Sequence, residues 1–263
     1  MKQALLFPFG QEWGWLLCTY IPAMRHKSRE YDETIVICPP SHRYLYQDFA
    51  NKFEDWDKKI DGVGYWGWSP KKPVKLPKKF KMIYPKADVF IPNERICTKW
   101  PREYFKYGEY DEKLHSDILI HARSEIKFGR KNRNWPVEKY ERLIKKLRVD
   151  RELSIASIGS LDGAHFVPGT LDLRGIDLEN LCNRMASSTV VVSVSSGPAH
   201  LASLSGCSHI VWTDCKVQKA IKATNRTRYF SLWNPFWSKC AVIDDQKWNP
   251  DVKSVYEKVR MFV

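Results

Sequence analysis

The feature that most constrains this chain is a short apolar segment followed at once by a helix start. Residues 190–194 are valine-rich and short enough to form a strand buried on both faces of a sheet. Ser196, Gly197 and Pro198 then have the composition of a helix N-terminus. The first N–H groups of a helix lack intrahelical partners, and the helix dipole favours an anion there. This turn is therefore a candidate phosphate site. His200, on the first turn of the helix, either faces the same anion or packs and caps the helix.

Strands and helices alternate along the rest of the chain. We expect strands at 4–7, 34–38, 87–92, 117–121, 153–158, 189–194 and 208–212, and helices at 41–49, 136–147, 177–185, 198–204 and 251–261. The helix at 41–49 is expected to continue as far as Phe53. Alternation of this kind is typical of an α/β fold with parallel sheets and right-handed crossovers.

A basic loop follows the strand predicted at 117–121. It carries Arg123, Arg130, Lys131 and Arg133, and it leaves the same carboxyl edge of the sheet as the Ser195-Ser196-Gly197 turn. Its cations and the helix N-terminus together suit a pyrophosphate, with charge-assisted contacts on one side and N–H donors on the other. The alternative is a solvated basic loop.

Three motifs carry a resemblance to a known family. Residues 192–206 resemble the Asp-Ser-Gly-Pro-x-His-Leu-Ala stretch of the heptosyltransferase-like glycosyltransferases, family 9 of the glycosyltransferases. The stretch from Ile118 to Arg123 resembles the strand and loop that open that family's donor domain, and residues 134–140 resemble its Trp-Pro-x-Glu-x-(aromatic) helix start. The resemblance covers mainly residues 118–214. Ser195 stands where the family has Asp, so the resemblance leaves the sugar unassigned.

The resemblance implies the GT-B fold, in which two Rossmann-like domains with parallel sheets face one another across a cleft. Residues 1–115 would be the acceptor-side domain, 116–250 the domain that binds the nucleotide sugar, and 251–263 a helix that crosses back to the first domain. Donor-binding residues would be Arg123, Arg130, Lys131, Arg133, Ser195, Ser196, Gly197 and His200.

The acceptor hydroxyl needs a general base from the first domain. The family places its base in the loop after the first strand, where Glu12 is the nearest carboxylate of this chain. Asp48, Asp88 and Glu94 are the alternatives, and a charge that complements a helix dipole is the structural explanation of Glu12. Transfer would invert the anomeric centre and need no metal, because cations and a helix dipole stabilise the leaving diphosphate.

Residues 62–86 combine aromatic side chains, lysines and prolines without any acid. Proline at this density predicts an exposed loop rather than a helix. Lysines attract phosphate and aromatic faces stack on bases or sugars, so the loop is a candidate acceptor-binding segment. A solvated connector is the alternative interpretation. The residues assigned to acceptor binding are Trp66, Trp68, Lys71, Lys72, Lys78 and Lys79.

Composition narrows the class of protein further. The net charge of +13 favours an anionic partner, whether nucleic acid, a phosphorylated glycan or an anionic lipid surface. The seven scattered cysteines indicate reduced thiols, and the chain shows neither a membrane-spanning segment nor a signal peptide, so we place it in a cytoplasm, including that of a phage-infected host. Asp55 and Asp57 read as a solvated charge cluster. We expect no metal and no cofactor, the nucleotide sugar being a co-substrate.

The sequence therefore predicts an enzyme, a glycosyltransferase that moves a sugar from a nucleotide diphosphate to a hydroxyl of an anionic acceptor. Charge and the basic segment slightly favour a hydroxymethylated base in phage-type DNA, whereas the resemblance implies a phosphorylated glycolipid such as a lipopolysaccharide core. A non-catalytic nucleic-acid or glycan-binding protein on the same scaffold is a third hypothesis. A Rossmann dehydrogenase is improbable, because no Gly-x-Gly-x-x-Gly follows a strand. Sugar, donor base and oligomeric state stay open.

Overall fold

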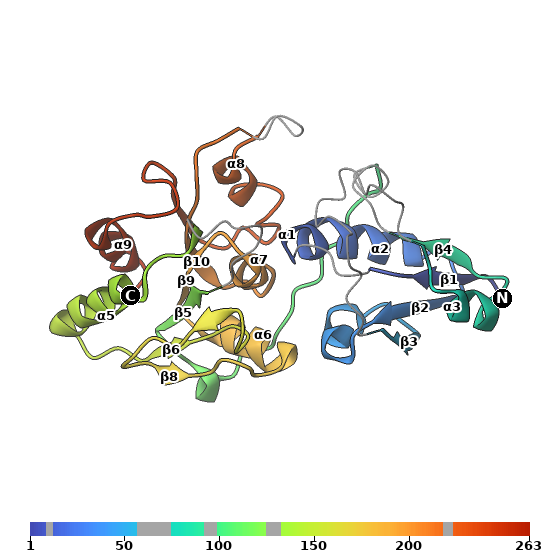
Figure 1. Ribbon diagram of the computed structural model, residues 1–263, viewed down its shortest axis with the longest axis horizontal. Helices are drawn as coiled ribbons and strands as arrows, with labels where there is room; N and C mark the ends of the chain where they lie inside the picture. Colours follow the sequence, from blue (N-terminus) through green and yellow to red (C-terminus); the bar gives the residue numbers. More distant parts are fainter. Residues whose placement is uncertain (9–12, 57–74, 92–98, 125–132, 218–222) are drawn as a thin grey trace. The chain divides into compact units, whose positions relative to one another are not determined.

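The computed structural model describes residues 1–8, 13–56, 75–91, 99–124, 133–217 and 223–263 (Figure 1). The chain divides into two compact units, Met1–Phe105 and Lys106–Val263. The sequence placed this boundary between residues 115 and 116. The earlier division follows from hydrogen bonds within the second unit, because the N–H of Tyr107 donates to the Leu204 carbonyl at 2.9 Å and the N–H of Asp111 donates to Ser187 Oγ at 2.9 Å.

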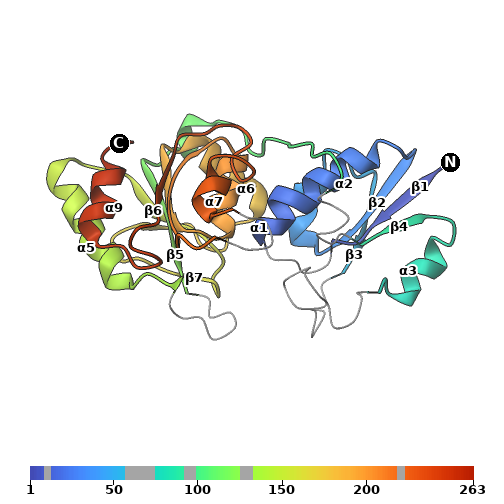
Figure 2. The same ribbon diagram turned by 90° about the horizontal axis from the view of Figure 1, so that it is seen from above.

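The first unit is built on a parallel sheet with the strand order β3-β2-β1-β4. Its elements are β1 (Gln3–Leu6), α1 (Trp13–Trp15), the π-helix η1 (Leu16–Tyr20), α2 (Ile21–Ser28), β2 (Glu33–Cys38), the 3-10 helix η2 (Pro40–Tyr46), β3 (Lys52–Asp55), α3 (Lys78–Ile83) and β4 (Asp88–Phe90). Figure 2 shows α2 and α3 on opposite sides of this sheet. Strand side chains alternate between the two faces, so Leu5, Phe7, Ile35 and Ile37 share one face and pack with Phe80 of α3.

Two expectations for the first unit are wrong. The helix predicted from Ser41 is a 3-10 helix that ends at Tyr46, and the chain then forms strand β3 over Lys52–Asp55. The residues after Tyr46 form a strand rather than more helix because they pair with β2. β3 extends the sheet by lying parallel to β2, with Ile35 opposite Lys52. The second concerns the proline-rich segment, whose described part contains α3 rather than only loop. Its prolines stand at the N-cap (Pro77) and beyond the C-cap (Pro85), where they do not interrupt the helix.

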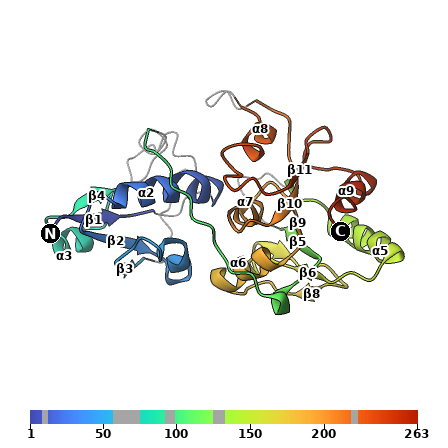
Figure 3. The ribbon, with the colours of Figure 1, turned by 180° about the vertical axis from the view of Figure 1, so that it is seen from behind.

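The second unit is built on a sheet with the order β11-β10-β9-β5-β6-β8, all parallel, and β7 pairs antiparallel with β5 (Figure 3). Its elements are the 3-10 helix η3 (Glu112–Leu114), β5 (Ile118–Arg123), α5 (Val137–Asp150), β6 (Ile155–Ser157), β7 (Ala164–His165), β8 (Leu171–Asp172), α6 (Leu178–Ser187), β9 (Val190–Val194), α7 (Gly197–Leu204), β10 (Ser208–Trp212), α8 (Asn225–Tyr229), β11 (Cys240–Ile243) and α9 (Val252–Val259). The strands and helices predicted in this half are confirmed to within a few residues.

Helices cover both faces of this second sheet. α5 and α9 lie together on one face and α6 and α7 on the other (Figures 1 and 2). Alternate residues of β5, β9 and β10 bury against Trp135, Tyr140 and the apolar side of α5. The last helix, which the sequence predicts to cross back to the first domain, is α9, and it buries Val255 and Val259 in this same core.

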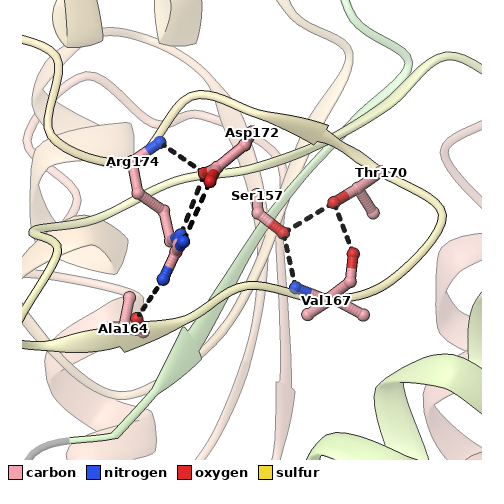
Figure 4. Close-up of polar contacts among 6 residues, drawn as sticks. All are labelled: Ser157, Ala164, Val167, Thr170, Asp172 and Arg174. Carbon is pink, nitrogen blue, oxygen red and sulfur yellow. Dashed lines mark hydrogen bonds and ion pairs between the residues drawn. The ribbon is translucent and has the colours of Figure 1, made fainter.

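Polar side chains shape the chain after β6 (Figure 4). Ser157 Oγ hydrogen bonds Thr170 Oγ1 at 2.7 Å and accepts from the N–H of Val167 at 3.1 Å. Arg174 donates to both carboxylate oxygens of Asp172 at 2.9 Å and to the Ala164 carbonyl at 3.0 Å. These contacts connect β7, which pairs with the end of β5, to β8, which pairs with β6.

The described residues contain no helix that is long and apolar enough to cross a membrane. The cysteines that the structure describes, Cys18, Cys38, Cys182, Cys207, Cys215 and Cys240, are all free thiols.

Candidate functional site

The strand order of the second unit identifies one edge of its sheet as a ligand site. The order β8-β6-β5-β9-β10-β11 runs outward in both directions from β5 and β9. Ligands of open α/β sheets bind at the carboxyl ends of the strands, where the order reverses. Here that point lies between β5 and β9, which end at Arg123 and Val194. The turn after β9 and Arg123, where the basic loop begins, therefore flank the expected ligand position.

The turn after β9 leaves a backbone donor open. Ser196 is the N-cap of α7 with an extended backbone, φ −158°, but its hydroxyl does not cap the helix and donates instead to the Val194 carbonyl at 2.9 Å. Pro198 in the first helical turn has no N–H. Among the described residues, none accepts a hydrogen bond from the N–H of Gly197. The N-terminus of α7 thus presents a free donor at the positive end of the helix dipole.

Two guanidinium groups stand at the same edge. Arg133 donates from Nη2 to the Ser195 carbonyl at 2.9 Å, and its guanidinium lies 4.2 Å from the centroid of the Trp248 ring. Arg123, the last residue of β5, is 7% exposed and donates to Asn134 Oδ1. Burial lowers the pKa of Arg123 to about 10, with a smaller contribution from the charge of Arg133. A bound anion would relieve the repulsion between these cations.

His121 supports the turn from the neighbouring strand. Its Nδ1 lies 3.1 Å from Ser196 Oγ and 3.3 Å from Ser193 Oγ. Burial lowers the pKa of His121 to about 3, with a smaller contribution from Arg123, so the ring is neutral at physiological pH. Tyr140 on α5 donates to the His121 carbonyl at 3.2 Å. The imidazole therefore links β5 to the turn after β9.

His200 is a packing residue in this structure. It is 3% exposed, its ring stacks on Tyr229 at 5.5 Å and meets Trp233 edge-on at 4.6 Å. Burial lowers the pKa of His200 to about 3, with smaller contributions from His209, Arg228 and Arg133. Of the two roles that the sequence allowed, the geometry favours support of α7 over contact with an anion.

Ser195 is held by a residue that the sequence did not indicate. The Tyr229 hydroxyl donates to Ser195 Oγ at 2.9 Å, and Ser195 is 4% exposed. Asn134 and Trp248 were missed as well, although they position Arg123 and Arg133. Asn134 and Trp135 stand next to Arg133 in the chain, so the Asn-Trp-Pro motif was the available signal; Tyr229 and Trp248 reach the site only through the tertiary fold.

The other predicted site residues fall into two groups. Glu12, Trp66, Trp68, Lys71, Lys72, Arg130 and Lys131 lie outside the described residues, as does Glu94. Lys78 and Lys79 are exposed on α3 of the first unit. Two alternative bases are engaged elsewhere, since Asp48 accepts from Arg25 through both of its oxygens and Asp88 accepts from the Tyr31 hydroxyl at 2.9 Å. No group of three or more His, Cys, Asp or Glu side chains able to hold a metal ion occurs in the described part of the chain.

Comparison by sequence gives no relative, because no protein-family model and no curated protein matches the chain. Comparison with solved structures finds proteins of similar fold. The ADP-heptose lipopolysaccharide heptosyltransferase II of E. coli is similar with a TM-score of 0.60 at 13% identity, over 100% of this chain and 98% of that one. E. coli heptosyltransferase WaaC, solved with ADP, is similar with a TM-score of 0.55 at 11% identity, over 99% of this chain and 100% of that one.

A glycosyltransferase of family 9 from Veillonella parvula DSM 2008 is similar with a TM-score of 0.54 at 10% identity, over 100% of this chain and 90% of that one. The fold is therefore that of the heptosyltransferase-like glycosyltransferases, which confirms the resemblance stated from the three motifs. Identities this low show the fold, an α/β architecture with parallel sheets, and leave activity to be argued from the site.

Proposed function

We propose that the protein is a glycosyltransferase that takes a sugar from a nucleotide-diphosphate donor held by the second unit. The observation that carries the proposal is the position of three groups at the strand-order reversal. Arg123 ends β5, Arg133 donates to the Ser195 carbonyl, and the N–H of Gly197 has no acceptor among the described residues. Together they offer two cations and a helix N-terminus to one diphosphate. Arg130 and Lys131 of the same loop would add charge to this donor site, and Ser195 and Ser196 shape its turn.

The same groups supply the chemistry that transfer requires. As the bond between sugar and diphosphate breaks, negative charge grows on the leaving oxygen, and fixed guanidinium groups stabilise it without reorganisation. We therefore propose metal-independent, inverting transfer. The acceptor hydroxyl would lose its proton to a base of the first unit, for which Glu12 is the candidate from the sequence.

A phosphorylated glycolipid is the acceptor class that we propose. The slight preference for a hydroxymethylated DNA base is not supported, because the structural relatives are heptosyltransferases and one of them is named for lipopolysaccharide. The charge of +13 suits an anionic glycolipid as well as it suits DNA. Trp66, Trp68, Lys71, Lys72, Lys78 and Lys79 are the proposed acceptor contacts.

The donor site is tested by replacing Arg133. Arg133→Ala should weaken ADP binding about 10-fold to 100-fold, because a hydrogen bond to a charged group contributes roughly 1.5–3 kcal/mol. Arg133→Lys should recover only part of the affinity, since an ammonium cannot lie flat on Trp248 while donating to Ser195. Isothermal titration calorimetry with ADP measures both variants.

Arg148→Ala is the matched control for that experiment. It removes a guanidinium of the same unit that donates to the Gly169 carbonyl on the surface. ADP affinity should be unchanged in this variant. Equal loss of affinity in Arg133→Ala and Arg148→Ala would mean that net charge, not the site, attracts the nucleotide.

A further inference from the structure

Helix α3 is fixed to the first unit along one side. Leu76, Phe80 and Tyr84 recur every four residues and are 4%, 1% and 7% exposed. They pack with Leu5, Phe7 and the neighbouring strand β2. Phe80 is the buried residue of α3 itself, while Leu76 precedes the N-cap and Tyr84 is the C-cap. These three side chains fix α3 to the core, and its other side chains point to solvent.

The solvent side of α3 combines aliphatic and cationic side chains. We call Lys78, Lys79, Lys81, Met82 and Ile83 the α3 surface. Met82 is 81% exposed and Ile83 is 55% exposed, and the three lysines are exposed as well. Lys78 precedes Met82 by four residues, and Lys79 precedes Ile83 by four, so each aliphatic side chain has an ammonium group as its neighbour on the helix.

The described residues provide no acid that pairs with this surface. Residues 75–87 contain no Asp or Glu. Among the described residues, no carboxylate forms an ion pair with Lys78, Lys79 or Lys81. The ammonium group of Lys79 lies instead over the Phe80 ring, 4.4 Å from its centroid. Within the part of the chain that the structure describes, the lysines of the α3 surface are therefore not paired with a carboxylate.

We propose that the α3 surface docks on an anionic phospholipid bilayer. Lysines alone would suit any polyanion, but Met82 and Ile83 offer apolar area that a sugar-phosphate backbone cannot cover and that acyl chains can. Lysine side chains beside them reach the headgroup phosphates while their methylene stems stay in the apolar region. Docking on a bilayer rests on the proposed function and extends it, because a glycolipid acceptor resides in such a bilayer.

Vesicle co-sedimentation tests this docking without any turnover. The natural chain should bind vesicles of phosphatidylcholine and phosphatidylglycerol and release them at high salt, with much weaker binding to phosphatidylcholine alone. Met82→Ser with Ile83→Ser should reduce partitioning at least about 10-fold. Lys78→Gln and Lys79→Gln should each reduce it about 5-fold, since a lysine near an anionic surface contributes about that factor.

Val149→Ser is the matched control, because Val149 on α5 is also 81% exposed. This variant should partition like the natural chain, and all variants should keep their ADP affinity and circular dichroism. Unchanged partitioning of the Met82→Ser, Ile83→Ser variant, or equal binding to both kinds of vesicle, would overturn the proposal. Stronger binding to duplex DNA than to anionic vesicles would overturn it too. Failure of the natural chain to bind ADP would contradict the proposed donor site. It would not affect the conclusion on vesicle binding by the α3 surface.

Discussion

Acidification from neutral pH to about pH 4.5 is expected to unfold the second unit. Its buried histidines His121, His200 and His209 have pKa values lowered by burial to about 3, about 3 and about 4. In the unfolded chain a histidine titrates near 6.5. Below that pH the histidines are protonated in the unfolded state but stay neutral in the folded state. The free energy of unfolding therefore decreases as the pH falls.

The loss is large because the three groups act together. Each histidine lowers the free energy of unfolding by about 1.4 kcal/mol per pH unit between its unfolded and folded pKa values. The three together therefore lower it by about 4 kcal/mol per unit. A domain is stable by only about 5–15 kcal/mol. Hydrogen exchange of peptides from β5, β9 and β10 is followed from about pH 7 to about pH 4.5. It measures how steeply the unfolding free energy of the second unit changes with pH, which we call the slope.

Single substitutions separate these histidines from general acid effects. His200→Phe keeps a ring against Tyr229 and removes one titrating group, so the slope should fall by about a third. His165→Phe, at an exposed position of β7, is the control for the replacement of a histidine by a phenylalanine outside the core. A slope that is the same in all three proteins would show that the buried imidazoles do not drive the acid transition.

Trp135→Ala should destabilise the second unit by about 3–5 kcal/mol, the range for truncating a buried tryptophan. Trp135 is 1% exposed, lies 4.6 Å from the Tyr140 ring and 5.0 Å from the Trp212 ring, and donates from Nε1 to the Pro250 carbonyl at 2.8 Å. It thus joins α5, β10 and the segment before α9.

Urea unfolding measures the effect. Trp135→Phe should cost less than Trp135→Ala, because it keeps the ring contacts and loses the hydrogen bond to Pro250. Trp237→Ala, at a position that is 78% exposed, should change stability by no more than about 0.5 kcal/mol. A loss below about 1 kcal/mol in Trp135→Ala would contradict the central place of this residue in the core.

The second unit could be predicted well because its local signals agree with its tertiary structure. The valines of β9 are buried on both faces of a parallel sheet, which is the condition that produces a continuous apolar run. Short elements such as α8 and β11 were not predicted. Their few residues carry no periodic pattern, and β11 is defined by pairing with β10 rather than by its own composition.

The first unit shows where local signals mislead. Residues 41–49 have an acceptable helix start, yet pairing with β2 draws the following residues into β3. In the segment before β4, proline density excluded a helix only if the prolines lay inside it. They flank α3, and the i, i+4 spacing of Leu76, Phe80 and Tyr84 was the better guide.

The site was predictable as a location and less so as a set of contacts. Alternation of strands and helices implies a parallel sheet, so the carboxyl ends of β5 and β9 were expected at one edge. The partners of the predicted residues do not follow from alternation, because Trp248 under Arg133 and Tyr229 beside Ser195 come from segments far away in the sequence. His200 was assigned to the donor site because the short motif that contains it gives no indication that its ring is buried against two aromatic rings.

The most direct test of the central claim is a transfer assay with labelled ADP-, UDP- and GDP-sugars. Phosphorylated lipopolysaccharide core and hydroxymethylated duplex DNA are offered side by side, with and without EDTA. We expect label on the lipopolysaccharide core from one donor, undiminished by EDTA and reduced in Arg133→Ala. Label on the DNA would contradict the proposed acceptor, and nucleotide binding without transfer to either acceptor would contradict the glycosyltransferase itself.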